Sequence, residues 1–375
     1  MAVPFFDVQY NLEPEVKDEL LARWRKVLDH GFFVNGPEIT ELETALAEFL
    51  GVAHVVACSN GSDALVLALK AAGVEPGDEV IVPSFTFFAS AGSVARLGAT
   101  PVFADVDPTT YNICIDSAVS LISERTKAIM PVHLYGRPVD VGALKAAAEA
   151  KAGREIVIVE DAAQAVGAVH KDGPCGGLGL TAGFSCFPTK NLAASGDAGF
   201  ATSVCEETAE RMRRLRQHGG GRQYYHDEVG FNFRLSALQA ATLMQHLPRL
   251  VEWNAARYQG ALHYQELFDA AGIEGEITTP EIVPGHVFHQ YVIRTPRRDE
   301  LMAHLRSKDI GCAVYYPLPL HLQPCFAHLG GQEGQLPAAE AAAKEVLALP
   351  IYPGVTPEQR QEVVEAVAEA FCPAG

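Results

Sequence analysis

The sequence predicts an α/β protein built on a largely parallel sheet with helices on both faces. After residue 52, short apolar runs such as VAHVVACS, EVIVPS and KAIMPVHL alternate with segments of helical spacing, which is the pattern of a doubly wound sheet. Residues 156–159, Ile-Val-Ile-Val, are typical of a strand buried on both faces. The length of 375 residues suits a large domain with a smaller one attached.

Two helices are predicted before this alternation. Residues 14–30 carry apolar side chains at helical spacing and stop at Gly31, and residues 37–50 repeat the pattern up to Gly51. Glycine often ends helices because it adopts the left-handed conformation without strain, and proline suits the first turn of a helix. The sequence shows no repeat with a period of about 20–50 residues and no segment of low complexity.

A turn, a basic helix and a long loop follow the second buried run, residues 182–187. Residues 195–199 are a tight glycine-rich turn, and the segment EETAERMRRLRQHGGG is predicted to be helical. Its arginines share the segment with glutamates, which favours a solvated helix surface over an anion-binding patch. Residues 219–233 are rich in glycine, aromatic and polar residues and are long for a plain connection, so we expect a functional loop.

The chain is expected to leave the large domain along a helical pattern that begins after Leu235. We place a boundary at Pro248, where a helix either ends or bends. This divides the chain into a large domain, residues 1–247, and a small α+β domain, residues 248–375. In the small domain, HQYVIRTP and CAVYYP are predicted strands on either side of the helix RDELMAHLRSKDIG, and residues 357–371 form a final helix.

The charge balance excludes some classes of partner. With 29 basic and 46 acidic residues, the chain has a net charge of −17 and no concentrated run of positive charge, so neither nucleic acid nor an anionic membrane is expected to bind. The sequence has no uninterrupted apolar stretch of about 18 residues and no signal-peptide pattern, so we expect a cytoplasmic protein. The eight cysteines lack metal-ligand spacing, and we expect neither a metal site nor a disulfide framework.

Polar residues follow two of the predicted strands. In an open α/β sheet, ligands bind at the carboxyl ends of the strands. One strand ends at Glu160 and Asp161, and the other presents Ser185 and, five residues later, Lys190. A lysine in an apolar setting tends to have a lowered pKa, which suits it for a Schiff base. Taken alone, Asp161 has the alternative of a helix N-cap, because it and Gln164 open a helix.

A further candidate lies where the first predicted strand meets its helix, in the stretch CSNGSDAL. Free backbone amides, the helix dipole, Gly61 and the Ser62 hydroxyl together make a phosphate site. Taken alone, Ser62 or Asp63 is more simply explained as a helix N-cap. One ring of the aromatic run FTFF after the next strand is placed to lie over the same site, although a lone aromatic stripe more often belongs to the core.

These features occur together, and their combination is specific. A phosphate cup, an aromatic ring, an aspartate and a Ser-x4-Lys at separate strand ends are the parts needed to hold pyridoxal phosphate (PLP). With these residues the sequence resembles the DegT/DnrJ/EryC1/StrS sugar aminotransferases, a family of fold-type I PLP enzymes. The resemblance covers nearly the whole chain, through FFDVQYNLEPEV, HGFFVNGPEITELE, CSNGSDAL, VPSFTFFAS, VEDAAQAVGA, SCFPTKNL, VGFNFRLSALQAA, YYPLPLHLQP and ALPIYPGVTPEQ. It implies a mainly parallel seven-stranded sheet in the large domain.

The resemblance implies a role for each matching residue. Lys190 would form the Schiff base and, once freed, move the proton between the donor's Cα and the C4′ carbon of the cofactor. Asp161 would keep the pyridine nitrogen protonated. Lysine at position 190, where the family's dehydratase branch has histidine, implies a transaminase. The residues implied to bind the cofactor are Gly61, Ser62, Phe87, Asp161, Gln164, Ser185, Lys190 and Asn232.

Within that set, the resemblance implies that Gln164 contacts the ring hydroxyl and that Phe87 stacks on the ring. Gly61 and the two serines would hold the phosphate. These three groups include no strong cation, so the phosphate needs further hydrogen-bond donors. The resemblance implies that Asn232 supplies one from a second subunit, which makes the protein a homodimer with shared active sites.

The implied activity is transfer of an amino group from L-glutamate to a keto group of a nucleotide-linked sugar, for a surface polysaccharide or a secondary metabolite. Residues 216–241 match relatives that act at C3 of the sugar better than those that act at C4. Arg234, Tyr316 and His321 are candidate substrate contacts, with the alternative for His321 of an ordinary surface histidine. Tyr315 stands where many members have histidine, so a polar group near the substrate is altered.

Two alternatives stay open at this point. One is a PLP-binding regulatory protein on the same fold, because a fold does not determine a function. The other is an enzyme of the same family that acts on a cyclitol or another non-nucleotide ketone. Retention of Lys190, Asp161, Gln164 and Ser185 together disfavours the regulatory protein, which would not need an electron-sink arrangement.

Overall fold

A seven-stranded sheet forms the centre of the computed structural model, which describes residues 3–10, 12–222 and 224–371. The strand order is β1-β9-β8-β5-β4-β2-β3; β9 runs antiparallel to both of its neighbours, and the other pairings are parallel. The predicted α/β class with a mainly parallel sheet is therefore confirmed. The strands are β1 (His54–Cys58), β2 (Glu79–Pro83), β3 (Thr100–Ala104), β4 (Thr126–Ile129), β5 (Val157–Asp161), β8 (Thr181–Ser185) and β9 (Gly199–Ser203).

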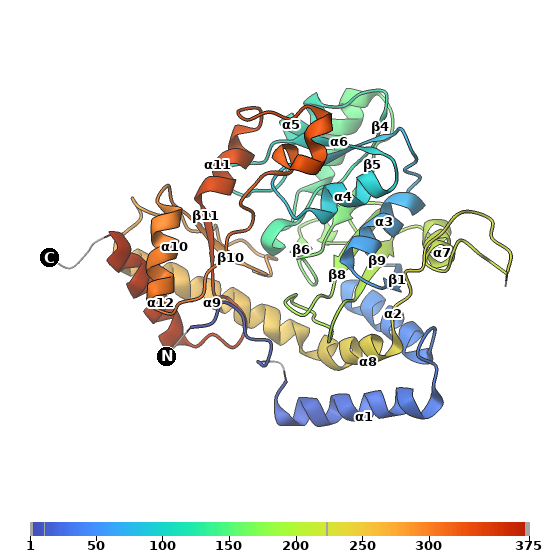
Figure 1. Cartoon of the computed structure of the whole chain (residues 1–375), viewed down its shortest axis with the longest axis horizontal. Helices are drawn as coiled ribbons and strands as arrows, with labels where there is room; N and C mark the ends of the chain where they lie inside the picture. Colours follow the sequence, from blue (N-terminus) through green and yellow to red (C-terminus); the bar gives the residue numbers. More distant parts are fainter. Residues whose placement is uncertain (1–2, 11, 223, 372–375) are drawn as a thin grey trace.

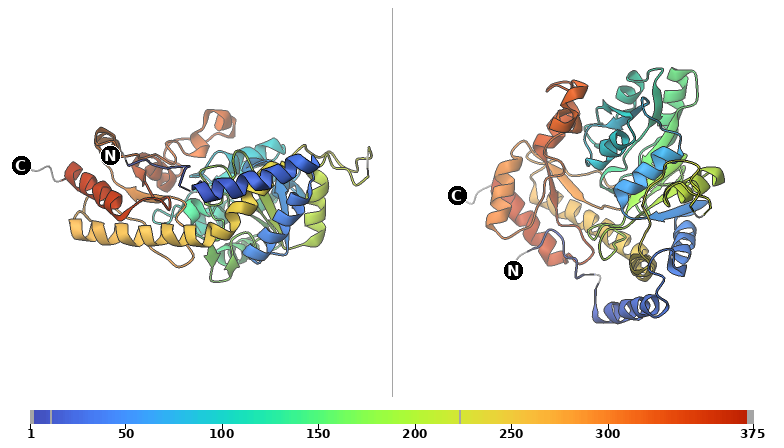
Figure 2. Two further views of the ribbon diagram at one scale, coloured as in Figure 1. Left: turned by 90° about the horizontal axis from the view of Figure 1, so that it is seen from below. Right: turned by 45° about the vertical axis from the view of Figure 1, so that its right-hand side comes forward.

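Helices cover both faces of the sheet (Figures 1 and 2). They are α2 (Pro37–Leu50), α3 (Gly61–Ala71), α4 (Ala89–Arg96), α5 (Ile115–Ser120), α6 (Val141–Ala152), α7 (Glu206–Leu215) and α8 (Ala237–His246). Because neighbouring strand residues point to opposite faces, Val55 and Ala57 of β1 pack with α2 and α8, whereas Val56 and Cys58 pack with α3, α4 and α7. Burial on both faces explains the continuous apolar runs in the sequence.

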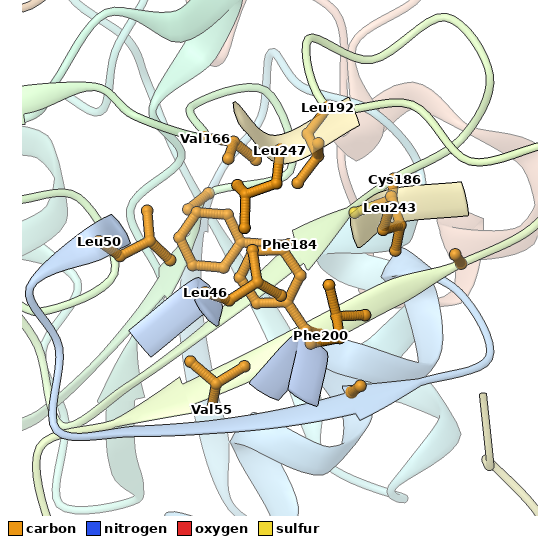
Figure 3. Packing of buried hydrophobic residues seen from close by; sticks show 14 of the residues in the cluster. Leu46, Leu50, Val55, Val166, Phe184, Cys186, Leu192, Phe200, Leu243 and Leu247 are labelled. Carbon is orange, nitrogen blue, oxygen red and sulfur yellow. The ribbon is translucent and has the colours of Figure 1, made fainter. Parts of the chain in front are cut away.

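The core between β8, β9, α2 and α8 is closely packed (Figure 3). Phe184 of β8 and Phe200 of β9 stack with their ring centroids 4.5 Å apart and their planes inclined by 12°. Leu46 of α2 and Leu243 of α8 are fully buried in the same cluster. This packing holds β8 in place, and with it Ser185 at the end of that strand.

The two predicted N-terminal helices are confirmed. The first, α1 (Pro14–His30), contacts α8, and the second is α2. Gly31 and Gly51 follow them in the left-handed conformation, with φ of 74° and 65°, and their N–H groups bond back to the carbonyls of Val27 and Ala47. Among the described residues, none of the helices has both the length and the apolar character that a bilayer crossing requires.

The chain leaves the sheet through α8, a 3-10 turn (Leu247–Arg249) and α9 (Leu250–Ala271). Pro248 lies in the 3-10 turn, at the predicted break between helices. Beyond it, β10 (Tyr291–Arg294) and β11 (Val346–Leu349) form an antiparallel pair that packs with α9, α10 (Arg298–Ser307) and α12 (Pro357–Phe371). Val3 is buried in this C-terminal cluster and bridges Ile310, so the start of the chain packs with its second half.

The predicted strand CAVYYP is wrong. Of these residues only Ala313 pairs with another strand, in an isolated bridge to Ala348, and the partner of β10 is β11. α11 (Pro337–Glu345) leads into β11. The aromatic pattern suggested a strand, but the Tyr315 and Tyr316 rings instead pack with Tyr135 and Phe85. Tertiary contacts of these rings thus override their strand propensity.

Candidate active site

Asp161, Ser185 and the start of α3 meet at the carboxyl end of two adjacent parallel strands. Asp161 is the last residue of β5 and pairs in register with Gly183 of β8, two residues before Ser185. The helix α3 begins beside them, because a Cβ on Gly61 would lie only 2.5 Å from the Cβ of Ser185. Parallel strands bring their carboxyl ends to one edge, so residues far apart in the sequence converge there.

Asp161 is a buried carboxylate, 4% exposed, held by two hydrogen bonds. Its Oδ2 accepts from the Ser90 hydroxyl at 2.7 Å, and its Oδ1 accepts from the Ala163 N–H at 3.1 Å. Burial raises the pKa of Asp161, and these hydrogen bonds oppose the shift. Each oxygen keeps acceptor capacity for a cation. Ser90, in the first turn of α4, was not predicted, because nothing in the local sequence distinguishes it from any other serine near a helix start.

Lys190 lies in the turn after β8 and is half-buried. Burial lowers the pKa of Lys190 to about 8, while the negative charge of Asp161 partly opposes the shift. The two charges therefore interact electrostatically. Lys190 nevertheless forms no salt bridge with a carboxylate among the described residues. An amine with a pKa near neutrality is a competent nucleophile and a proton carrier at physiological pH.

Gln164, Tyr316 and Phe87 form a wall of the same region. The Gln164 Nε2 donates to the Tyr316 hydroxyl at 3.1 Å, and its Oε1 accepts from the Tyr135 N–H at 2.6 Å. Burial raises the pKa of Tyr316, so its phenol stays protonated. The Phe87 ring is 55% exposed and its centroid lies 6.0 Å from that of Tyr316. An exposed aromatic face beside a polar wall can receive a planar ring.

The start of α3 is capped by Asn60, so the N-cap alternative for Ser62 or Asp63 is wrong. The Asn60 Oδ1 accepts from the Asp63 N–H at 2.9 Å. The Asp63 carboxylate is occupied by Arg96, with Nη1 at 3.0 Å. The first N–H groups of a helix have no partner within it, so those of Gly61 and Ser62 remain available to an anion.

The other three predicted residues lie in different settings. Asn232 is exposed on the loop before α8, and its side chain makes no hydrogen bond to the described residues. Arg234 lines an open hollow with His218, Tyr224 and Val229. The sequence predicted that His321 contacts the substrate or lies at the surface. The structure buries it instead.

His321 is 3% exposed, and both of its ring nitrogens are engaged. Nδ1 lies 2.7 Å from the Ser84 hydroxyl at the end of β2, and Nε2 lies 3.3 Å from the Glu340 carboxylate. Burial lowers the pKa of His321, which the Glu340 charge partly offsets. The surface alternative is therefore wrong, and the residue ties its segment to the sheet instead of offering a free nitrogen.

The second acid of the pair at the end of β5 has a structural role. Glu160 is fully buried and accepts from His133 Nε2 at 2.9 Å and from three backbone N–H groups of residues 176–179 at 2.8 to 2.9 Å. Consecutive strand residues point to opposite faces, so Glu160 and Asp161 face different surroundings. The backbone N–H of His133 also donates to the Asp161 backbone carbonyl at 3.0 Å, which fixes the end of the strand.

The donor set fits PLP. A buried, hydrogen-bonded carboxylate suits a protonated pyridine nitrogen, and a lysine with a lowered pKa suits the aldehyde. The Gly61 and Ser62 N–H groups at a helix start, with the Ser185 hydroxyl nearby, suit a phosphate. The absence of a side chain at Gly61 is required for this approach, since a Cβ would clash with Ser185.

Comparison with known proteins agrees with this fit. The sequence model of the DegT/DnrJ/EryC1/StrS aminotransferase family matches residues 14–368. The chain is 47% identical over 373 residues to a "Pleiotropic regulatory protein" of Geobacillus stearothermophilus, covering 99% of each chain. It is 40% identical over 368 residues to a UDP-N-acetyl-3-dehydro-alpha-D-glucosamine 3-aminotransferase of Acidithiobacillus ferrooxidans, covering 98% of this chain and 97% of that one.

The fold is also matched by solved structures. Streptomyces venezuelae DesV, solved in complex with a ketimine intermediate, superposes with a TM-score of 0.93 at 39% identity, over 100% of this chain and 99% of that one. The aminotransferases of this family use PLP, and solved relatives contain it or its amino form. The whole-chain match, the shared fold and the fit of the site lead to one conclusion. The chain belongs to the DegT/DnrJ/EryC1/StrS family of PLP-dependent aminotransferases.

Proposed function

We propose that this aminotransferase moves an amino group from L-glutamate to the C3 keto group of a nucleotide-linked sugar. The observation that carries the proposal is Lys190, with a pKa lowered to about 8, next to buried Asp161 at the carboxyl edge of β5 and β8. The relative from Acidithiobacillus ferrooxidans, named as a nucleotide-sugar 3-aminotransferase and matched over nearly its whole length, supports the choice of substrate.

When bound, PLP supplies an electron sink for the negative charge that develops at the donor's Cα. The Nζ of Lys190, as a neutral amine, takes the proton from that carbon and returns it to the second reacting carbon. Its lowered pKa brings both protonation states within reach near neutral pH. Asp161, held by Ser90, would pair its carboxylate with a protonated pyridine nitrogen. Gln164, whose Nε2 donates to the Tyr316 hydroxyl, would contact the ring hydroxyl.

The activity is tested by following the two half-reactions of amino transfer in turn. The purified protein is loaded with L-glutamate, which should change the visible absorption of the cofactor, and is then offered a panel of keto-sugar nucleotides and a free keto-cyclitol. Return of the original absorption with a nucleotide-linked sugar supports the proposal. Return only with the cyclitol would select the non-nucleotide alternative.

The position of the new amine is a separate question. The C3 assignment rests on residues 216–241 and on the named relative. NMR of the product should show the amine at C3. An amine at C4 overturns this part of the proposal and leaves amino transfer intact.

The regulatory alternative has one observation in its favour, the name of the Geobacillus stearothermophilus relative. It is not favoured, because that name does not exclude catalysis and the chain keeps the lysine, aspartate and glutamine of a working site. If L-glutamate leaves the cofactor's absorption unchanged, the regulatory alternative replaces the enzyme.

The nucleophile's pKa gives a pH prediction. In the cofactor-free protein, PLP capture needs neutral Lys190, so the capture rate should rise with pH and level off above about 8. The unfolded chain binds more protons at this lysine between about 8 and 10.5, so its contribution makes the free energy of unfolding rise with pH through that window.

Rapid mixing followed by absorption measures the capture rate. The Asp161→Asn variant is the matched control: removing a charge that raises the lysine pKa should move the midpoint to lower pH. A wild-type midpoint near the ordinary lysine value would contradict the prediction.

The phosphate cup gives another prediction. Gly61→Ala should weaken PLP binding by about tenfold, because relieving the clash of the new Cβ with Ser185 costs about 1–3 kcal/mol. Gly275→Ala is the matched control, since its Cβ meets no atom within 4 Å and it should bind PLP normally. Fluorescence titration with PLP measures both. Equal affinities would show that the start of α3 does not hold the phosphate.

We also propose a homodimer in which Asn232 completes the partner's phosphate site. The exposed Asn232 side chain makes no hydrogen bond to the described residues, so it is free to act elsewhere. Its loop extends away from the body beyond α7 (Figure 1) and exposes Tyr224 and Val229 by 86% and 88%. Leu28 of α1 and Phe32 after it are 61% and 62% exposed on the same chain. Exposed apolar side chains that gather into one patch mark protein interfaces, so these residues are the candidates for the subunit contact.

Subunit mixing tests the shared site. Lys190→Ala and Asn232→Asp should each abolish activity, the second by placing a negative charge beside the phosphate. Under conditions that exchange subunits, a one-to-one mixture should regain up to about one quarter of the wild-type activity, because heterodimers carry both lesions in one site and none in the other. Wild-type subunits treated alike provide the control. No recovery in the mixture would place Asn232 in its own subunit's site or outside any site.

The remaining parts of the proposal concern the cell. A cytoplasmic location is supported by the seven described cysteines, all free thiols, which suit a reducing compartment. The product would be an amino sugar for a surface polysaccharide or a secondary metabolite. Arg234 and Tyr316 are the proposed contacts to the sugar nucleotide.

A further inference from the structure

A small, partly open cavity of about 70 Å³ lies beside the Lys190 turn. Its lining is mostly aromatic and aliphatic, with Thr189, Arg257, His289 and Gln290 as the main polar members. The volume is enough for a small polar group and far too small for a sugar nucleotide.

Arg257, on α9, brings an incompletely paired charge to this cavity. It is 1% exposed, and its Nη1 donates to the carbonyls of Phe288 and His289 at 3.4 and 3.2 Å. Its Nε and Nη2 make no well-aligned hydrogen bond among the described residues. The Tyr10 hydroxyl lies close to the guanidinium and partly offsets the lowering of the Arg257 pKa by burial. Leaving a buried guanidinium with two unused donors is costly, so an acceptor from outside the chain is expected there.

The cavity shares its walls with the active site. Thr189 precedes Lys190, and His289 Nδ1 bonds the Asn191 side chain, which follows Lys190, at 3.0 Å. Burial and the positive charges of Lys190 and Arg257 lower the pKa of His289, so this ring is neutral and lies within the field of both cations. An anion at Arg257 would therefore lie close to the nucleophile.

We propose that Arg257 binds a carboxylate group of the amino-acid donor and so presents the donor's Cα to Lys190. The inference rests on the proposed function, because it names the group that recognises the donor. Nε and Nη2 form one edge of the guanidinium, and their parallel N–H bonds match the two oxygens of a carboxylate. The Tyr10 hydroxyl, next to the guanidinium, can donate a further hydrogen bond to that carboxylate. The apolar lining strengthens such contacts by excluding water.

The test follows the donor half-reaction of the PLP-loaded enzyme with L-glutamate, without any sugar. In Arg257→Gln, the glutamate concentration at half-saturation should rise about 30-fold or more, as expected for loss of charge-assisted hydrogen bonds. Arg257→Lys, which keeps the charge but not the two-pronged geometry, should fall between this variant and wild type.

Arg298→Lys is the matched control. Arg298 is another buried arginine whose guanidinium bonds backbone carbonyls, those of Ala343 and Val346, and it should keep the wild-type half-saturation. Calorimetry with glutarate, a dicarboxylate without an amine, gives a readout independent of turnover. The wild-type holoenzyme should bind glutarate, and both Arg257 variants should bind it more weakly.

Half-saturation in both Arg257 variants within about threefold of wild type, or equal glutarate binding, overturns the inference. If Arg257→Gln does not fold, the inference is tested by the half-saturation of Arg257→Lys and by its glutarate titration against wild type. Failure of the sugar panel would sink the proposed substrate and leave this inference standing, because the donor half-reaction involves no sugar. Conversely, an unaffected donor half-reaction removes Arg257 from the site and leaves the sugar assignment intact.

Discussion

Replacing Lys190 by alanine is expected to lower the rate of amino transfer by about 10⁴-fold or more, because in the proposed mechanism Lys190 is both the covalent anchor and the proton carrier. The structure supplies the reason for choosing this lysine: burial lowers its pKa to about 8 at the edge where Asp161 ends β5. Turnover with L-glutamate and a keto-sugar nucleotide measures the loss. Borohydride reduction and peptide mass mapping of the wild-type protein should place the pyridoxyl mass on Lys190.

Lys171→Ala is the control for that experiment. Lys171 is an exposed lysine held by Asp140 at 3.1 Å, and its loss should change neither activity nor labelling. The assignment is refuted by a pyridoxyl mass on a different lysine, or by a Lys190→Ala variant with full activity.

Asp161→Asn is expected to slow amino transfer by about 10³-fold while the protein stays folded. Asparagine keeps the shape and can still accept the hydrogen bond from Ser90, but it lacks the negative charge that we propose holds a proton on the pyridine nitrogen. Breaking a buried charge pair costs about 3–5 kcal/mol, and each 1.4 kcal/mol is about a factor of ten in rate. Single-turnover kinetics with L-glutamate measure the effect.

Glu79→Gln controls for the loss of a buried carboxylate. Glu79 is 7% exposed at the amino end of β2, on the opposite edge of the sheet, where it pairs with Arg125. This variant should lose stability but keep its rate. If Asp161→Asn reacts as fast as wild type, Asp161 does not act on the cofactor.

Local patterns were enough to predict the class of the sheet and many of its elements. The Ile-Val-Ile-Val run before Glu160 predicts a strand buried on both faces, and helices do cover each face of β5. The glycines after α1 and α2 mark the ends of these helices because few other residues adopt the left-handed conformation. The grouping of Asp161 with Ser185 followed from the rule that parallel strands end at one edge. Hydrophobic period and backbone preference are local properties, so one chain segment reveals them.

Only the tertiary structure decided which of several equivalent side chains does what. Sequence could not separate Asn60 from Ser62 as the cap of α3, nor single out Ser90 as the partner of Asp161, because each choice depends on a segment distant in the chain. His321 was expected at the surface or the substrate and is instead bonded at both nitrogens inside the protein. Arg257 has no local signal at all, since its significance comes from a cavity lined by six separate parts of the chain. Burial and hydrogen-bond partners are set by packing between distant segments, and local sequence does not encode them.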